Sequence, residues 1–336
     1  MMSAALEQAR RGVGLTSPNP PVGCVIVRDG QIIGRGFHAR AGGPHAEVEA
    51  IASIANSELL KGSTAYVTLE PCSTTGKTPP CCSALIAAGI ARVVYGTDDP
   101  NPAHAGRGRE VLEKAGIEVV ADVEGEACRA LIRPWAHFMA TGMPWVVAKA
   151  GMSLDGRLTR PAGEGQWLTS ETSRADAQRL RAEVDAILIG AGTLRADDPS
   201  LTIRDPAATR AAKRQPWRVV LTAKGDLPSD AKLFVDEHRE RTLVCEGRDL
   251  ADVLRSLAAD RDCVKVMIEG GGNLLGRAFQ DGLVDEVQFY MAPLICGADT
   301  VSAIGVGLPS SVELDAIEVL PMERDFRLTG LVNKAE

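Results

Sequence analysis

The feature that most constrains this chain is a histidine and two cysteines arranged as metal ligands. His45 stands in Pro44-His45-Ala46-Glu47, and Cys72 and Cys81 enclose a short polar run that ends in two prolines. A His and two thiolates are one ligand short of a closed structural zinc site, so the fourth position is left to water. Glu47 is not needed as a ligand and can move protons. The pattern predicts a catalytic zinc site with ligands His45, Cys72 and Cys81 and with Glu47 as the catalytic residue.

Two other interpretations compete with a catalytic zinc site. A single His-x-Glu is common by chance, and cysteines in a reducing cell are often only small buried hydrophobes. A structural zinc would need a fourth protein ligand, and the sequence shows no convincing one. Pro71 directly precedes Cys72 and Pro80 directly precedes Cys81, and this ordered combination is hard to obtain by accident. It favours the catalytic site.

Charge and hydropathy limit the partners of the chain. A net charge of -7 argues against the broad basic surface of a nucleic-acid binder. No apolar run approaches the roughly 20 residues of a membrane span, and residues 1–11 lack the apolar core of a secretory signal. Eight cysteines in 336 residues do not make a disulfide scaffold. We therefore expect a cytoplasmic protein without nucleic-acid or membrane partners.

The length is typical of about two domains. A boundary is expected near Thr141-Gly142, where a helical stretch gives way to a new strand, which divides the chain into residues 1–142 and 143–336. Only the first part contains a His-x-Glu and a cysteine pair, so the second part is not a duplicate.

Alternating helical and extended patterns in residues 1–142 predict a layered α/β domain with helices on both faces of a sheet. Asp29-Gly30 is a favoured hairpin turn. Cys81 should begin a helix whose positive end stabilises its thiolate, while Cys82, about 100° away, should pack into the core. Expected helices cover 3–10 (capped by Ser3), 46–60, 81–88 and 124–139, and expected strands cover 22–27, 31–34, 64–69, 91–95 and 117–120.

The second domain contains a strand that runs into Gly270-Gly271-Gly272-Asn273 and a helix. Such a loop can bring backbone N–H groups close to phosphates, but a tight structural turn is an equal alternative, because the run lacks the Gly-x-Gly-x-x-Gly pattern. Expected strands cover 143–149, 186–190 and 264–269, helices 170–184 (capped by Ser170) and 274–280, and a polar loop 192–199.

Zinc-dependent nucleoside and nucleic-acid deaminases close their site with Pro-Cys-x-x-Cys, whereas Cys72 and Cys81 are nine residues apart. This longer spacing, together with Pro18-Asn19-Pro20-x-Val22-Gly23-Cys24 and Asp99-Pro100-Asn101-Pro102, resembles the deaminase of riboflavin biosynthesis. The resemblance implies a cytidine-deaminase-like three-layer α/β/α domain, with Glu47 as proton shuttle. It further implies substrate contacts from Asn19, His38, Lys77 and Asn101. Thr74-Thr75 stands where the family often carries one or two His, so the ring-binding side of the pocket is expected to differ.

Residues of the second domain resemble the pyrimidine reductase of the same pathway. The resemblance rests on Lys149-Ala150-Gly151-x-Ser153-Leu154-Asp155-Gly156-Arg157, Gln166-Trp167-x-Thr169-Ser170, Thr193-x-x-x-Asp197-Asp198-Pro199 and Glu269-Gly270-Gly271. It implies a dihydrofolate-reductase-like α/β fold that uses NADPH. The implied NADPH-binding residues are Gly151, Trp167, Thr193, Asp197, Gly271, Gly272, Asn273, Leu274, Leu275, Gly276 and Arg277. The implied substrate-binding residues are Gly165, Arg181, Leu201, Arg204 and Glu269, and Lys149 could orient the sugar.

Together these resemblances imply a bifunctional riboflavin-pathway enzyme with zinc and NADPH as cofactors. A zinc hydrolase would deaminate a small phosphorylated pyrimidine, a diaminopyrimidinone ribosyl phosphate, and an oxidoreductase would reduce its ribosyl chain to ribityl. We also expect a homo-oligomer. One alternative keeps a deaminase for free nucleosides or RNA, with a C-terminal binding module. The other is a scaffold with structural zinc.

Overall fold

A computed structural model describes residues 1–75, 79–101, 104–204 and 214–334 of the chain. Lys77, which was expected to contact substrate, lies outside the described residues. Contacts within the chain divide it into two compact units, Met1–Gly142 and Met143–Glu336, called here the first and second unit.

The first unit is built on a five-stranded sheet in the order β2-β1-β3-β4-β5. β1 runs antiparallel to β2 and β3, whereas β3, β4 and β5 are parallel. Asp29 and Gly30 both have positive φ, 49° and 76°, as the expected hairpin turn requires. The strands are β1 (Gly23–Arg28), β2 (Gln31–Phe37), β3 (Thr64–Val67), β4 (Arg92–Tyr95) and β5 (Glu118–Val120).

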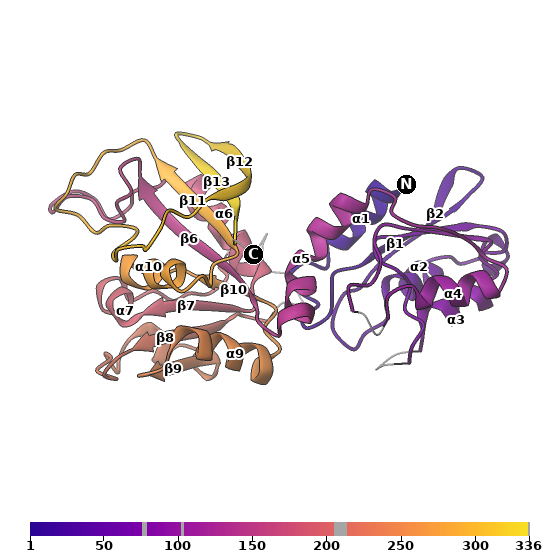
Figure 1. Cartoon of the computed structure of the whole chain (residues 1–336), viewed down its shortest axis with the longest axis horizontal. Coiled ribbons are helices and arrows are strands. Elements are labelled where there is room, and N and C mark those ends of the chain that lie inside the picture. The colour runs from indigo at the N-terminus through magenta and orange to yellow at the C-terminus, as the bar shows by residue number, and fades with distance from the viewer. Residues whose placement is uncertain (76–78, 102–103, 205–213, 335–336) are drawn as a thin grey trace. The chain divides into compact units, whose positions relative to one another are not determined.

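Helices cover both faces of this sheet, which confirms the expected three layers (Figure 1). One face packs its alternate strand residues against α2, α3 and α4, and the other face packs against α1 and α5. The helices are α1 (Met2–Arg10), α2 (Ala46–Ala52), the 3-10 turn η1 (Ser57–Leu59), α3 (Cys81–Ala87), α4 (Arg107–Lys114) and α5 (Gly125–Thr141).

Two helix boundaries in the first unit differ from those expected. The helix expected to run to residue 60 ends at Ala52, because the Ser53 hydroxyl donates to the Ala50 carbonyl and the Asn56 side chain caps η1. Ser3 does not cap α1; its backbone N–H and hydroxyl donate to Glu124. In both places a short polar side chain bonds to a group other than the predicted one.

The second unit contains an eight-stranded sheet in the order β12-β13-β11-β6-β10-β7-β8-β9. Neighbouring strands are parallel throughout the run β11-β6-β10-β7-β8-β9. The antiparallel β12–β13 hairpin lies at one edge of the sheet, next to β11 (Figure 1). They are β6 (Trp145–Ser153), β7 (Ala186–Gly190), β8 (Trp217–Thr222), β9 (Thr242–Glu246), β10 (Lys265–Ile268), β11 (Glu286–Ala292), β12 (Leu314–Met322) and β13 (Asp325–Val332).

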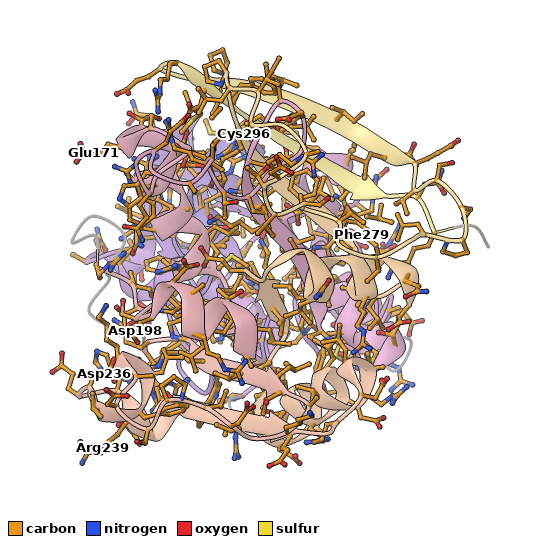
Figure 2. The ribbon with its side chains drawn as sticks, turned by 90° about the vertical axis from the view of Figure 1, so that its left-hand side faces the viewer. Glu171, Asp198, Asp236, Arg239, Phe279 and Cys296 are labelled. Carbon is orange, nitrogen blue, oxygen red and sulfur yellow. The ribbon has the colours of Figure 1, made fainter. Side chains whose placement is uncertain are left out.

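Helices again lie on both faces, so the second unit is also a layered α/β structure. One apolar cluster joins the sheet to α9 and α10, and another joins the opposite face to α6, α7 and α8. On the surface, Asp236 (Figure 2) accepts a 2.8 Å bond from the buried guanidinium of Arg218. The helices are α6 (Glu171–Glu183), α7 (Ala191–Asp197), α8 (Lys232–Val235), the 3-10 turn η2 (Arg239–Arg241), α9 (Leu250–Arg261) and α10 (Gly272–Gln280).

The prediction of a polar loop at residues 192–199 is wrong, because most of this segment forms α7. Leu194 is the one buried residue of this short helix, so the apolar pattern is too sparse to reveal a helix. The glycine run also differs from expectation, since α10 begins at Gly272 and takes in part of the run. Ser170 caps α6 as predicted, accepting a bond from the Ser173 N–H.

Among the helices that the structure describes, none is long and apolar enough to cross a membrane.

Candidate metal site and active-site cavity

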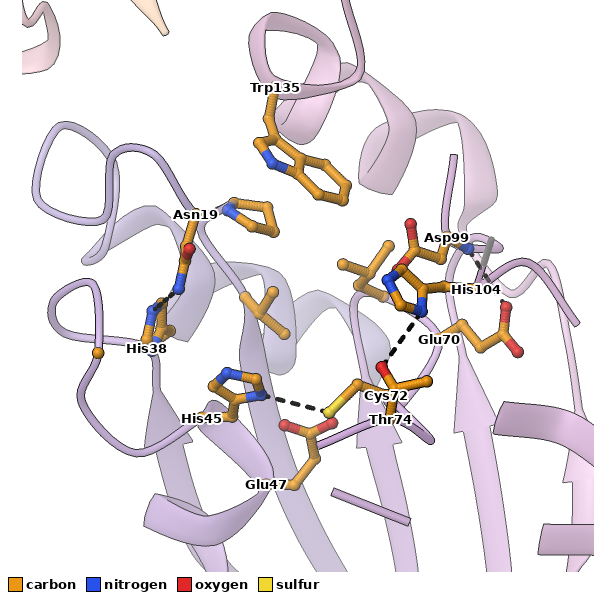
Figure 3. Close-up of a pocket in the computed structure, with 14 residues that line it drawn as sticks. Asn19, His38, His45, Glu47, Glu70, Cys72, Thr74, Asp99, His104 and Trp135 are labelled. Atoms are coloured by element: carbon orange, nitrogen blue, oxygen red, sulfur yellow. Dashed lines mark hydrogen bonds between the residues drawn. The ribbon is translucent and has the colours of Figure 1, made fainter. Parts of the chain in front are cut away.

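The three predicted metal ligands meet in the first unit. His45 is the residue before α2, Cys81 is the first residue of α3, and Cys72 lies in the loop after β3. Their donor atoms all lie within 4.8 Å of one another. His45 Nδ1 is 3.1 Å from Cys81 Sγ. It is 3.6 Å from Cys72 Sγ, as the dashed line in Figure 3 marks. Two helix starts and one strand end therefore converge on a single point.

These spacings fit a tetrahedral zinc. Zinc bonds of about 2.3 Å to sulfur and about 2.1 Å to nitrogen put neighbouring donors roughly 3.5–3.8 Å apart. The donor set is also chemically suited, because imidazole and thiolate are the ligands that zinc prefers in proteins. No other cluster of three metal-binding side chains occurs in the described ranges. The residues present could hold zinc with little movement.

The helix N-terminus acts on a different thiol from the one expected. The Cys81 N–H at the start of α3 donates to Cys72 Sγ over 3.3 Å. The pKa of Cys72 is lowered to about 4, chiefly because the Cys81 thiol donates a hydrogen bond to the Cys72 sulfur. Burial of Cys72 acts in the opposite direction and is outweighed. The pKa of Cys81 is raised by the same bond and by burial. The expected thiolate stabilisation therefore falls on Cys72, while Cys82 packs in the core as predicted, 1% exposed.

Glu47 lies in the first turn of α2 and faces the same cavity as the ligands. Only 3% of the residue is exposed. Burial, followed by the negative charge of Cys72, raises the pKa of Glu47 to about 7. A buried carboxylate beside the donor set can hold or release a proton near the metal position.

The cavity above these residues has a volume of about 320 Å³. Asn19 and His38 form one side of it, and Trp135 of α5 lies above (Figure 3). His38 Nδ1 lies 2.9 Å from the Pro44 carbonyl, which can only accept, so Nδ1 carries the proton and Nε2 accepts from the Asn19 amide over 3.1 Å. This bond fixes the orientation of the Asn19 side chain in the cavity.

Sequence reasoning missed the residues on the opposite side of the cavity. Asp99 and His104 line it there together with Thr74 (Figure 3). The Asp99-Pro100-Asn101-Pro102 motif was a signal for this loop, although His104 lies two residues beyond it. Trp135 lies within a long helix and had no local signal.

Glu70 is a second missed residue, and it organises that side of the cavity. Its buried carboxylate accepts backbone N–H groups of Asp99, Gly106, Gly108 and Arg109, at 2.9–3.3 Å. It therefore joins the segment that ends at Cys72 to Asp99, to Gly106 and to the start of α4. Acceptance of helix N-terminal N–H groups by a carboxylate is strongly stabilising.

In the second unit, Glu269 follows β10 and binds two buried cations. Lys149 Nζ of β6 donates to Glu269 Oε1 over 2.7 Å, and Arg181 of α6 donates to Oε2 over 2.9 and 3.1 Å. Burial alone would raise the pKa of Glu269, but the charges of Arg181 and Lys149 lower it to about 2. Arg181 also donates to the Thr202 carbonyl. Its guanidinium is thus largely occupied within the protein.

Lys149 also lies against the Tyr290 ring, which belongs to a polar network that sequence reasoning missed. Its ammonium lies 5.9 Å from the centroid of the Tyr290 ring. The Tyr290 hydroxyl donates to Asp176 over 2.9 Å, and Arg327 donates to the same carboxylate over 2.7 Å. The network joins β6, β11 and β13 to α6, so it could be seen only after folding.

Several residues expected at the cofactor surround the ends of the parallel strands β7 and β10. The Thr193 hydroxyl accepts the Gly271 N–H over 3.0 Å. Asp197 ends α7, and its pKa is raised by partial burial and by the charge of Glu269. Gly151 lies on neighbouring β6, whereas Trp167 is in a loop, 57% exposed, with the Arg174 guanidinium 5.0 Å from its ring.

Two of the glycines in α10 have a packing role. A Cβ at Gly272 would lie 2.0 Å from the Ser302 carbonyl oxygen, and one at Gly276 would lie 2.6 Å from the Val306 side chain. The segment 302–306 therefore packs directly on the helix. In contrast, a Cβ at Gly271 would meet only an ordinary contact with Thr193, at 3.4 Å.

The expected substrate residues of the second unit differ widely in exposure. Leu201 is buried and has a positive φ of 50°, which a side-chain-bearing residue adopts rarely. Arg204 is exposed and bonds to Ser200, and Gly165 has open space where a side chain would be. Arg204 is thus the more accessible of the two arginines expected to bind substrate.

Family models match both units. The model described as the cytidine and deoxycytidylate deaminase zinc-binding region matches residues 1–97, and the RibD C-terminal domain model matches residues 144–327. These matches confirm the fold expected for the two parts of the chain.

Curated relatives and solved structures match nearly the whole chain. The riboflavin biosynthesis protein RibD of Escherichia coli K12 is 42% identical over 325 residues, covering 89% of this chain and 88% of the relative. That of Bacillus amyloliquefaciens is 39% identical, covering 98% and 95%. The structure of Acinetobacter baumannii RibD (form 1) has a TM-score of 0.90 at 37% identity, covering 99% and 98%. A Thermotoga maritima deaminase/reductase structure has a TM-score of 0.87 at 33% identity, covering 99% and 97%.

Proposed function

Because this chain belongs to the RibD family of bifunctional riboflavin-biosynthesis enzymes, we propose that its two units act in turn on one phosphorylated pyrimidine. The first unit deaminates a diaminopyrimidinone ribosyl phosphate. The second unit then reduces the ribosyl chain of the deaminated product to a ribityl chain. The first half of this proposal is carried by the convergence of His45, Cys72 and Cys81, of which His45 and Cys72 line one cavity together with buried Glu47.

In the first unit, His45, Cys72 and Cys81 would hold zinc, which when bound supplies a Lewis acid that lowers the pKa of water toward about 7. Glu47 takes one proton from the attacking water and gives it to the ring nitrogen. It then takes the second proton from the added hydroxyl and gives it to the amine, so that ammonia leaves and a ring carbonyl forms. Asn19, oriented by His38, bonds to the pyrimidine ring.

In the second unit, the residues around the ends of β7 and β10 would hold NADPH, which when bound supplies the hydride. Thr193, Asp197 and Gly271, the N-cap of α10, lie in this region. The family resemblance assigns Gly151 and Trp167 to the same cofactor site. Gly271 has no side chain, and the bond from its N–H to the Thr193 hydroxyl fixes its position. A phosphate can therefore approach the backbone closely at this point. The cofactor contacts extend along α10 through Asn273 and Arg277.

Substrate binding in the second unit divides between the two arginines. Arg204 is exposed and can pair with the substrate phosphate. Arg181 is held by Glu269, so it acts on the substrate by fixing that carboxylate. Lys149, held at the other oxygen of Glu269, donates to the sugar. Gly165 offers its backbone, and the strained backbone at Leu201 borders the same site. We further propose a homo-oligomer in the cytoplasm.

A coupled assay tests the two activities together. The zinc-loaded chain, given the diamino substrate without NADPH, should release ammonia and accumulate the deaminated ribosyl compound. After NADPH is added, the amount of NADPH oxidised should equal the amount of ribityl product formed. Reduction of the diamino substrate without release of ammonia would contradict the proposed order.

Trp167→Ala and Asp197→Ala should each weaken NADPH binding by about tenfold or more, because an exposed aromatic face and a nearby carboxylate would be lost from the cofactor site. Titration of NADPH, followed by its fluorescence, measures this. Deamination should remain at the wild-type rate. Asp230→Ala, an exposed aspartate of the same unit, is the matched control. Wild-type NADPH affinity in both variants would show that the cofactor lies elsewhere.

A further inference from the structure

We infer that His104 is a substrate-contacting residue of the deaminase cavity, held there by Thr74 and by the loop that Glu70 anchors. This inference rests on the proposed function of the first unit. It assigns a specific contact to the side of the cavity opposite Asn19 and His38.

His104 and Thr74 meet at the cavity although they are 30 residues apart in sequence. His104 Nδ1 lies 3.2 Å from Thr74 Oγ1, and both residues line the same cavity as His45 and Glu47 (Figure 3). Thr74 is two residues after the ligand Cys72. The imidazole is therefore fixed relative to the metal position through a short stretch of chain.

Backbone bonds fix the loop that carries His104. Its own N–H donates to the Asn101 carbonyl over 2.8 Å, and the Asn101 N–H donates to Asp99 Oδ1 over 2.8 Å. Glu70 accepts the N–H groups of Asp99 and Gly106 at the two ends of this loop. Described residues on both sides of His104 are thus bonded to a buried carboxylate that directly precedes Pro71-Cys72. A side chain held this firmly is preorganised to contact a ligand.

The bond to Thr74 uses one ring nitrogen of His104 and leaves Nε2 for a ligand. Within the part of the chain that the structure describes, Thr74 is the one side chain hydrogen-bonded to His104. The Thr74 hydroxyl can donate or accept, so the neutral imidazole can present either an acceptor or a donor at Nε2. No Lys or Arg is among the described residues lining this cavity. This wall therefore suits the polar edge of the pyrimidine ring, which carries amino and carbonyl groups.

The same arrangement accounts for Thr74-Thr75, where the chain departs from the family resemblance. The ring-binding side of the cavity keeps an imidazole, but the imidazole comes from the loop after β4 and not from the segment after Cys72.

His104→Ala should raise the KM for deamination on the order of tenfold, the effect expected from loss of one ligand hydrogen bond in a partly buried site. The kcat should stay within about threefold of wild type, because the metal ligands and Glu47 are unchanged. Zinc content and turnover of the deaminated substrate by the second unit would show that the variant is folded and loaded.

Moving the imidazole from position 104 to position 74 should reverse part of the increase in KM. The double variant Thr74→His, His104→Ala places the ring on the other member of the hydrogen-bonded pair and should recover at least about threefold in KM relative to His104→Ala. Thr74→Val should raise KM as well, because it frees the imidazole, whereas Thr75→Val should not. Thr75 is an exposed neighbour that does not line the cavity and is the matched control.

An unchanged KM in His104→Ala would overturn the inference, as would a fall in kcat with unchanged KM, since that pattern indicates a role in the chemical step. If the zinc-loaded wild-type chain releases no ammonia, the proposed function fails. Equilibrium dialysis of the diamino substrate against wild type and His104→Ala would then still decide whether the contact exists.

Discussion

Replacement of Glu47 by Gln is expected to lower the rate of deamination by at least about 10²–10⁴, the usual contribution of a general acid–base group. The amide is nearly the same size as the carboxylate but cannot accept the proton of water near neutral pH. Glu47 is 3% exposed within the ligand cavity, so bulk water cannot readily replace it. Steady-state release of ammonia from the diamino substrate measures the effect.

Two controls separate proton transfer from metal binding. Zinc content of Glu47→Gln should match wild type, whereas Cys72→Ala plus Cys81→Ala should lose both the metal and deamination. Glu47→Gln should still oxidise NADPH with the deaminated substrate, since Lys149 and Glu269 lie in the other unit. Near wild-type deamination by Glu47→Gln would remove Glu47 from the proton-transfer role.

Glu269→Gln is expected to impair both reduction and stability of the second unit. The change leaves the ammonium of Lys149 and the guanidinium of Arg181 without their shared carboxylate, and these side chains are only 14% and 10% exposed. Breaking a buried charge pair costs about 3–5 kcal/mol of unfolding free energy. A displaced Lys149 should lower reductase turnover about 10²-fold, the effect of a misplacement of roughly 1 Å. Urea titration and NADPH oxidation with the deaminated substrate measure the two effects.

The stability effect should depend on pH in a defined direction. The pKa of Glu269 is lowered on folding, so its contribution is fully present above its unfolded pKa of about 4.3 and is lost as the pH falls through about 2. The difference between wild type and Glu269→Gln should therefore shrink in acid. Asp252→Asn removes a carboxylate from an exposed pair with Arg255 in the same unit, 59% and 61% exposed, and should cost less than about 1 kcal/mol. Equal losses in the two variants would contradict the buried role of Glu269.

The sequence by itself determined the parts of the protein that depend on neighbouring residues. Pro80 precedes Cys81 because a proline suits a helix start, so α3 and its ligand could be placed in advance. Asp29-Gly30 defined the hairpin because both residues tolerate positive φ. Ser170 marked the start of α6. The spacing of His45, Cys72 and Cys81 singled them out as candidate ligands, and in the structure their donor atoms lie within 4.8 Å of one another, near buried Glu47.

Only the tertiary structure decided which groups face one another across elements. Arg181 is an arginine like Arg204 in sequence, but α6 turns it toward Glu269, and burial makes that pairing obligatory because an isolated buried charge is costly. Gly272 and Gly276 resemble a phosphate-binding run, yet their lack of side chains is required by the segment 302–306 packed on α10. His104 meets Thr74, 30 residues away in sequence, beside Asp99 and Gly106, whose N–H groups bond to Glu70. Such long-range contacts depend on the packing of distant segments, which no local pattern of residues encodes.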